Sequence, residues 1–160
     1  MASASNLHGE RGEIMTKFYM DACCYNRPLD NQRQQRIYYE SQSILTLIWR
    51  SYWGYYELIG SEALLFELRN PLARLLFHFA VRDIVRYDLS VKKRAKQIRA
   101  GSNIKEMDSV HLASAEAAGV NVFLTTDDRL IKACAKIPLP YRVLNPVIYL
   151  FSEVLNDDDR

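Results

Sequence analysis

Three short apolar runs of the chain lead directly into acidic or hydroxyl side chains. The runs are KFYM, ELI and NVFL, and the polar residues after them include Asp21, Ser61, Glu62, Thr125, Thr126, Asp127 and Asp128. A single acid after a strand usually caps the next helix. Ligands of an open parallel sheet, however, bind outside the carboxyl ends of its strands, where such acids would meet. An oxygen-only set of this kind favours Mg²⁺ or Mn²⁺.

Two further acids lie on helical segments that can reach the same edge. Glu67 follows Ser61 on one helix, and Asp108 stands near the start of another. Clustered carboxylates raise one another's pKa unless a cation neutralises them, and a bound divalent cation keeps positions open for water and phosphate. The pattern therefore predicts metal-dependent phosphoryl chemistry. His111, on the same helix face as Asp108, could be a ligand or a base, but we expect it to pack behind the acids.

Other catalytic patterns are absent from the sequence. It has no nucleophile elbow, no phosphate-binding loop and no glycine-rich dinucleotide motif, and the whole chain contains six glycines. One alternative is a Mg²⁺-dependent phosphatase with Asp21 as a covalent nucleophile. That mechanism would place a second aspartate two residues later, where this chain has Cys23. We therefore rank the phosphatase last.

Composition is that of one globular domain. The 160 residues are 49% hydrophobic and 25% charged, which is ordinary for a soluble domain of this size. No apolar run approaches the length of a membrane span, and the N-terminus lacks the apolar core of a signal peptide. We expect a disordered leader over residues 1–14, left by cloning or by an upstream start, then a folded domain over residues 15–152. An acidic tail is expected over residues 153–160.

Cysteine and charge content restrict location and partners. Three cysteines that cannot all pair favour a reducing, cytoplasmic setting over a disulfide framework; they are Cys23, Cys24 and Cys134. The net charge of +2 selects no partner by itself. Basic residues do concentrate in one helical segment, at Lys92, Lys93, Arg94, Lys96 and Arg99. Such a segment can bind RNA phosphates, although a charge run is more often a solvated helix face.

Apolar periodicity and turn residues predict alternating strands and helices. Strands are expected at Lys17–Met20, Tyr56–Ile59, Ile84–Tyr87, Asn121–Leu124 and Tyr141–Leu144. Helices are expected at residues 32–52, 62–69, 71–81, 91–100 after a Ser90 cap, 105–118 and 128–136, with a final helical turn after Pro146.

The fold class follows from the character of the strands. They are short, continuous apolar runs separated by helices, as in parallel sheets that are covered on both faces. We therefore predict a three-layer α/β/α sandwich with a mostly parallel sheet of about five strands. Aromatic residues at the end of the first long helix could stack on bases, but we expect them in the core or in an oligomer contact; they are Trp49, Tyr52, Trp53, Tyr55 and Tyr56.

Four blocks of the sequence together resemble a PIN domain of the VapC toxin type. They are FYMDACCYNRP, LIGSEALLFELR, MDSVHLASAEAAGV, and NVFLTTDDRLIKA followed by VLNP. The last two blocks, in this order and close together, are the most specific. The resemblance extends from about Lys17 to Leu150. It implies a metal-dependent ribonuclease fold, with a mostly parallel sheet between helices.

The resemblance also implies roles for particular residues. The family's metal-binding, catalytic acids would be Asp21, Glu67, Asp108 and Asp127. Glu62 lies nearer the strand end than Glu67, but Glu67 matches the family's spacing after the serine, and we choose it. Supporting roles would fall on Thr125 or Thr126, on Asn26, on Glu62, and on Asp128 as a helix cap or outer ligand.

One departure concerns the loop after the first acid. Many family members have Ser or Thr there, whereas this chain has Ala22, Cys23 and Cys24, so Asn26 is the nearest substitute. PIN domains of this type commonly form homodimers and can be held inactive by a small antitoxin protein.

The expected function is a Mg²⁺- or Mn²⁺-dependent endoribonuclease, the toxin of a toxin–antitoxin pair. Its RNA backbone would be positioned by Arg27, Arg69, Lys92 and Lys93. The alternative is a non-catalytic PIN-like module that binds RNA or protein. All four positions of the family's acids hold an acid in this chain, which argues against that alternative.

Overall fold

The computed structural model describes residues 15–158, so the predicted leader lies outside the described residues. Its five strands form one parallel sheet in the order β3-β2-β1-β4-β5. The strands are β1 (Lys17–Met20), β2 (Glu57–Ser61), β3 (Asp83–Val85), β4 (Val122–Leu124) and β5 (Arg142–Leu144). The α/β prediction is confirmed, and the sheet is parallel throughout. Because β1 is central, its carboxyl end is flanked by the ends of β2 and β4.

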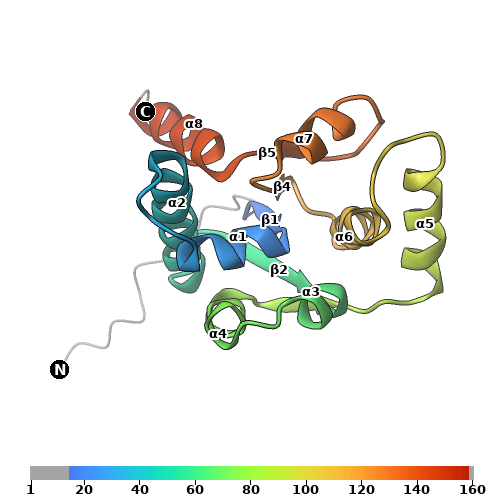
Figure 1. The fold of residues 1–160 in the computed structure, drawn as a ribbon, viewed down its shortest axis with the longest axis horizontal. Helices are drawn as coiled ribbons and strands as arrows, with labels where there is room; N and C mark the ends of the chain where they lie inside the picture. Colours follow the sequence, from blue (N-terminus) through green and yellow to red (C-terminus); the bar gives the residue numbers. More distant parts are fainter. Residues whose placement is uncertain (1–14, 159–160) are drawn as a thin grey trace.

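Helices separate the strands in sequence. They are α1 (Ala22–Asn26), α2 (Gln35–Tyr52), α3 (Glu62–Glu67), α4 (Pro71–Ala80), α5 (Leu89–Arg99), α6 (Glu106–Ala117), α7 (Asp128–Cys134) and α8 (Pro146–Asp158), with a short 3₁₀ turn at Arg27–Leu29. Figure 1 shows α1, α2, α4 and α8 gathered on one side of the sheet and α5 and α6 on the other. This gives the predicted three layers. No helix within residues 15–158 combines the length and apolarity needed to cross a membrane.

Burial explains why the central strands are apolar at every position. Phe18, Tyr19 and Met20 of β1 are all fully buried, as are Phe123 and Leu124 of β4. A strand covered on both faces cannot alternate apolar and polar residues, because neither face meets water. The continuous runs seen in the sequence are therefore a consequence of the three-layer arrangement.

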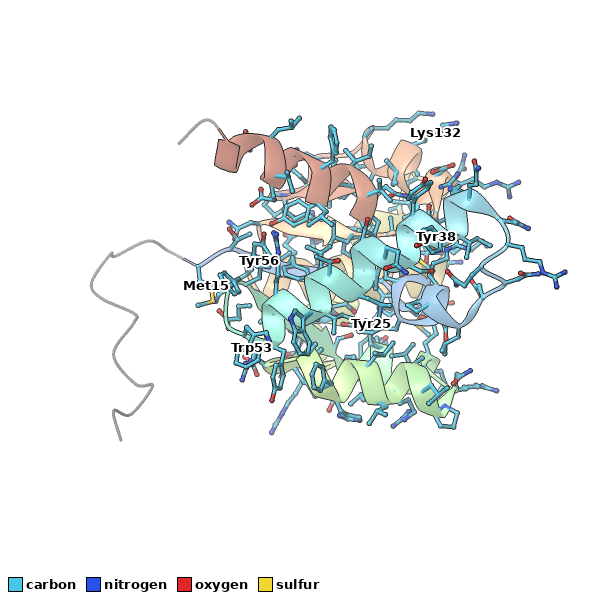
Figure 2. The ribbon with its side chains drawn as sticks, turned by 90° about the vertical axis from the view of Figure 1, so that its left-hand side faces the viewer. Met15, Tyr25, Tyr38, Trp53, Tyr56 and Lys132 are labelled. Carbon is cyan, nitrogen blue, oxygen red and sulfur yellow. The ribbon has the colours of Figure 1, made fainter. Side chains whose placement is uncertain are left out.

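The longest helix buries one stripe and exposes another. Ile44, Leu47 and Ile48 of α2 are buried at helical spacing, as predicted. Trp49 and Trp53 are 56% and 57% exposed, so neither is a core residue, and the oligomer contact is the part of the expectation that stays a prediction. Of the five aromatic residues at this end of α2, only Tyr56 is buried. Figure 2 looks onto this layer, with α2 crossing in front and Trp53 at its end.

Three helix boundaries differ from the prediction for identifiable reasons. The helix α5 is capped by Asp88, whose carboxylate accepts from the Val91 N–H and from the Ser90 hydroxyl, so Ser90 is not the cap. The long helix begins at Gln35, after a turn held by Gln32 and Asn31 side chains. The C-terminal helix α8 continues to Asp158 and so includes part of the predicted acidic tail.

One glycine sets the approach of α4 to the sheet. Gly60 in β2 lies so near the Phe77 ring that a Cβ atom there would be 2.4 Å from the Phe77 Cζ. It would also be 3.0 Å from a Val81 methyl carbon. Only a residue without a side chain allows this packing, and the next residue, Ser61, begins the polar edge of the sheet.

Gly60→Ala should lower the free energy of unfolding by about 2 kcal/mol, because the added methyl group overpacks a closed core. Urea denaturation measures this, and Phe77→Leu supplies the matched control. In the double variant the alanine should cost clearly less than it does alone, because the shorter side chain leaves room for it. Strictly additive losses would contradict the close approach.

Candidate active site

The first acid stands where the central strand ends. Asp21 follows β1 and caps α1, with its Oδ1 accepting from the Ala22 N–H at 2.8 Å. Its Oδ2 accepts from the Thr125 hydroxyl at 3.0 Å, which ties the ends of β1 and β4 together. Asp21 is only 6% exposed. Burial raises the pKa of its carboxyl group, while His111 and the Thr125 hydrogen bond partly oppose the shift.

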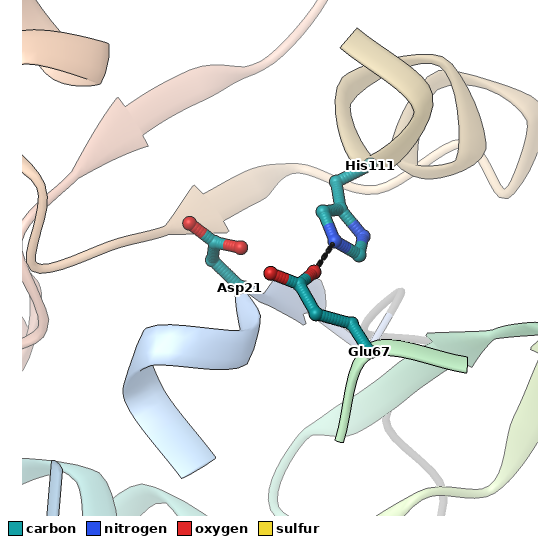
Figure 3. A group of neighbouring side chains, drawn as sticks. All are labelled: Asp21, Glu67 and His111. Atoms are coloured by element: carbon teal, nitrogen blue, oxygen red, sulfur yellow. Dashed lines mark hydrogen bonds and ion pairs between the residues drawn. The ribbon is translucent and has the colours of Figure 1, made fainter. Parts of the chain in front are cut away.

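Glu67 and His111 face Asp21 from the two neighbouring helices. Ligand atoms of these three residues all lie within 4.8 Å of one another, and Figure 3 shows the two carboxylates and the imidazole turned toward a common space. The His111 Nε2 lies 2.5 Å from the Glu67 Oε2. Glu67 is the last residue of α3 and remains partly exposed, whereas His111 is fully buried on α6.

A buried chain of hydrogen bonds supports the imidazole from behind. The Tyr19 hydroxyl lies 2.7 Å from His111 Nδ1 and 2.6 Å from the Ser61 Oγ. Ser61 Oγ also accepts from the Leu64 N–H and so caps α3. In the neutral tautomer that donates Nε2–H to Glu67, Nδ1 accepts from Tyr19, and Tyr19 accepts from Ser61. This relay links the orientation of Glu67 to β1, β2 and α6.

The remaining two acids lie within electrostatic reach of this group of three side chains. Asp108 lies half-buried in the first turn of α6, and burial together with Asp21, Asp127 and Glu67 raises its pKa to about 6, against an opposing effect of His111. Asp127 follows the β4 end, and its backbone N–H donates to the Thr125 Oγ1 at 3.1 Å. The structure thus brings Asp21, Glu67, Asp108 and Asp127 to one edge of the sheet.

A model of the PIN domain family matches residues 37–136, more than half of the chain. The chain belongs to the PIN domain family. Among curated proteins no sequence relative is found. Solved structures similar to this PIN domain include FitAcB from Neisseria gonorrhoeae, at 19% identity over 81% of this chain and 97% of that one, with a TM-score of 0.52. Another is FitAB bound to an IR36 DNA fragment, at 18% identity over 81% and 95%, with a TM-score of 0.49. The first likeness shows a shared fold.

The two adjacent aspartates of this PIN domain have different roles in the structure. Asp127 caps α7, since its Oδ1 accepts from the Arg129 and Leu130 N–H groups. The prediction that Asp128 is the cap is therefore wrong. Asp128 instead accepts two hydrogen bonds from Arg36, at 2.7 and 2.8 Å. This pairing holds the pKa of the Asp128 carboxyl below its usual range.

A buried carboxylate outside the predicted set holds the loop that carries Asp127. Glu40 of α2 is 1% exposed and lies 2.8 Å from both the Arg27 Nε and the Arg36 Nε. Arg27 donates to the Thr126 hydroxyl at 3.1 Å, and Arg36 donates to the Thr126 carbonyl oxygen at 3.2 Å. The Asn145 amide also donates to Glu40, at 2.9 Å. The loop between β4 and α7 is thus fixed from both sides.

The other predicted residues lie outside the acidic cluster. Glu62 accepts from the Tyr87 N–H at 2.7 Å and is not among the residues grouped around Asp21. Asn26 donates to the Ala22 carbonyl oxygen and so closes α1. Arg27 is largely engaged by Glu40, Thr126 and Asp30 rather than free for a ligand. Arg69, Lys92 and Lys93 are exposed, the last two on α5.

Sequence reasoning left several contacts of the site unassigned. Tyr19 precedes Asp21 by two residues, so strand alternation could have placed both on one face. Cys23, which stands where many family members have Ser or Thr, has its Sγ 3.5 Å from the Asp21 Oδ2 and 3.4 Å from the Thr125 Oγ1. Glu40 and Arg36 are spaced as a helical ion pair, which the sequence does show. Their other partners, Thr126 for Arg36 and Asn145 for Glu40, lie 90 or more residues away and cannot be predicted from local spacing.

The donor set of this PIN domain fits a hard divalent cation. Four carboxylates converge with no lysine or arginine in hydrogen-bonded contact with Asp21 or Glu67 among the contacts of the described residues. Burial, and to a smaller extent repulsion from neighbouring acids, raises the pKa values of Asp21 and Asp108, and a bound cation would oppose both effects. Carboxylate oxygens are preferred ligands of Mg²⁺ and Mn²⁺. The cluster can therefore hold a metal ion.

Asp108→Asn should stabilise the metal-free protein above pH 6. The folded-state pKa of about 6 exceeds the usual 3.8, so the carboxylate destabilises the fold once ionised, and this cost disappears below about pH 4. We expect a gain on the order of 1 kcal/mol at pH 7 in EDTA, allowing for partial exposure. Thermal unfolding across pH measures it.

The matched control for Asp108→Asn is Glu106→Gln, which removes an exposed acid from the same first helical turn. It should give no gain at any pH. Because acids in the first turn of a helix are normally stabilising, equal gains for both variants would show that the effect does not come from the cluster.

Glu40→Gln should destabilise the protein by roughly 3 kcal/mol, because it removes the buried counter-charge of the partly buried Arg27 and leaves only the more exposed Asp30. The control is Glu57→Gln, whose exposed pair with Lys17 at 3.9 Å should contribute less than about 1 kcal/mol. Chemical denaturation of both variants gives the comparison. A smaller loss for Glu40→Gln than for Glu57→Gln would show that the network contributes little.

Proposed function

We propose that this PIN domain is a Mg²⁺- or Mn²⁺-dependent endoribonuclease that hydrolyses RNA phosphodiester bonds. The observation that carries the proposal is the convergence of Asp21, Glu67, Asp108 and Asp127 at the carboxyl edge of the sheet, beside a fully buried histidine. All four positions implied by the family resemblance hold acids, which argues against a non-catalytic binding module. Family membership adds support, because PIN domains are typically nucleases.

In this proposal the four acids bind the metal ion, and the neighbouring side chains orient the acids. The four carboxylates would hold the cation, which supplies Lewis-acid activation of water and neutralises charge on the phosphate. Thr125 orients Asp21 through a 3.0 Å hydrogen bond. His111 orients Glu67 and is itself held by Tyr19. Because these supports are buried, the carboxylates keep their positions when metal and substrate exchange.

The RNA backbone would approach from the exposed side of the cluster. Arg129 and Asp127 line a polar pocket of about 370 Å³ together with Arg27 and Arg36. Arg129 is exposed, so it is better placed than Arg27 to meet a phosphate. Arg69, two residues after Glu67, is also exposed. These cations would compensate the phosphates that flank the reacting bond.

We further infer that the protein is the toxin of a toxin–antitoxin pair and forms homodimers in the cytoplasm. The resemblance to VapC-type toxins supports this role. An exposed apolar groove of about 450 Å³ between α2 and α4 supports a protein partner; its apolar lining includes Leu45, Ile48, Trp49, Leu76 and Phe79. An amphipathic helix of a small antitoxin would cover such a groove.

The central test is cleavage of single-stranded RNA with Mn²⁺ or Mg²⁺. Asp21→Asn, Glu67→Gln and Asp127→Asn should each lower kcat at least about 100-fold, because each removes a ligand charge. Asp128→Asn is the matched control and should retain most activity, since Asp128 pairs with Arg36 outside the cluster. EDTA should abolish cleavage by the wild type.

Two results would contradict the nuclease proposal. One is cleavage that persists in EDTA, and the other is equal activity of the wild type and the three acid variants. A greater loss for Asp128→Asn than for Asp127→Asn would show that the ligand assignment in this loop is displaced by one residue.

A further inference from the structure

An apolar pocket of about 410 Å³ lies between α3 and the first turn of α6. This α3–α6 pocket is lined by Glu62, Ala63, Phe66, Tyr87, Glu106, Met107 and Val110. Its volume falls within the range of small-ligand sites, roughly 300–1,000 Å³. None of these residues belongs to the acidic cluster, and the proposed chemistry does not use them.

Two residues that line this pocket are sequence neighbours of proposed metal ligands. Phe66 precedes Glu67 on α3, and Met107 precedes Asp108 on α6. Met107 also lies one helical turn before His111, so the two share a helix face. A group that enters the pocket would therefore be a close neighbour of whatever the cluster binds.

The pocket exposes aromatic surface that the fold does not use. Phe66 is 71% exposed, and Tyr87 is 49% exposed. The Tyr87 backbone N–H is tied to the Glu62 carboxylate at 2.7 Å, which fixes the segment after β3 against α3. Exposed aromatic rings at a fixed position are surfaces on which a flat ring can stack.

The charge at the rim restricts what can enter. Glu62 and Glu106 are exposed carboxylates that line the pocket; one oxygen of Glu62 accepts from the Tyr87 N–H, and one oxygen of Glu106 lies 3.5 Å from Arg99. Such acids repel a phosphate but accept hydrogen bonds from the amino groups of cytosine, adenine or guanine. In a contact between two copies of the chain, the same acids would approach the acids of the partner. The rim therefore fits a nucleobase better than a phosphate or a second copy.

Resting on the proposed function, we propose that the α3–α6 pocket binds one unpaired nucleobase of the RNA next to the reacting bond, and prefers bases that carry an amino group. Phe66 and Tyr87 stack on the base, and Glu62 and Glu106 accept from its amino edge. The pocket is thus a specificity site, which selects where the nuclease cuts.

The test measures binding of fluorescent single-stranded oligoribonucleotides by anisotropy in EDTA, with one base at a time replaced by an abasic ribose. In the wild type, removal of the base at one position should weaken binding by on the order of 10-fold, as expected for loss of one stacked base. Phe66→Ala should abolish this position dependence. The control Phe151→Ala removes a similarly exposed ring on α8 and should preserve it.

A second arm tests the acidic rim. With uracil, cytosine, adenine or guanine at the sensitive position, the wild type should prefer the three bases with amino groups. Glu62→Gln should reduce this preference while leaving the abasic effect in place, because the amide both donates and accepts. An unchanged preference in both Glu62→Gln and Glu106→Gln would overturn the role of the rim.

Other outcomes would overturn the pocket itself. One is a uniform loss of affinity in Phe66→Ala for every oligonucleotide. Another is loss of a dimer in Phe66→Ala, measured by light scattering, with unchanged position dependence; this would make the pocket a contact between two copies. The binding arm needs no catalysis, so absence of cleavage with intact position dependence would refute the nuclease proposal but not the base site.

Discussion

The buried carboxylate of Glu40 is the interaction on which the geometry of this PIN domain most depends. It lies in contact with Arg27, Arg36 and Asn145, so one side chain of α2 joins the turn after α1, the loop after β4 and the segment after β5. A charge taken out of water is tolerated only when such partners surround it. Because the two arginines in turn hold Thr126, the loop that presents Asp127 has one position relative to the sheet.

The acidic cluster lacks the charged partners that surround Glu40. There the fold gathers carboxylates without arginine partners and holds them by neutral donors instead: the Thr125 hydroxyl for Asp21 and the His111 ring for Glu67. These donors orient the acids but do not cancel their charge. The protein therefore concentrates uncompensated negative charge at one edge of the sheet, which costs stability and which the proposed metal ion would neutralise.

Much of this arrangement could be predicted from sequence, because it follows from burial. Continuous apolar runs mark the strands, and since the carboxyl ends of parallel strands meet at one edge of the sheet, the sequence places Asp21 and Asp127 together. The predictions that failed concern side chains whose partners the sequence pattern does not reveal. Asp128 looks like a helix cap until Arg36, 92 residues away, is seen beside it, and Ser90 and Asp88 are equally good caps until the local turn is built. The side-chain network around Glu40 has no local signature beyond its spacing from Arg36.

The central position of β1 has a consequence for synthesis of the chain. Tyr19 pairs with Ile59 on one side and with Phe123 on the other, so the first strand made must wait for residues near both the middle and the end of the sequence. Contacts so distant close late, since the entropy of the intervening chain opposes them. A nascent polypeptide on the ribosome therefore carries Asp21 and Glu67 long before Thr125 and Asp127 emerge. Any activity that needs the complete edge begins only after Asp127 has emerged.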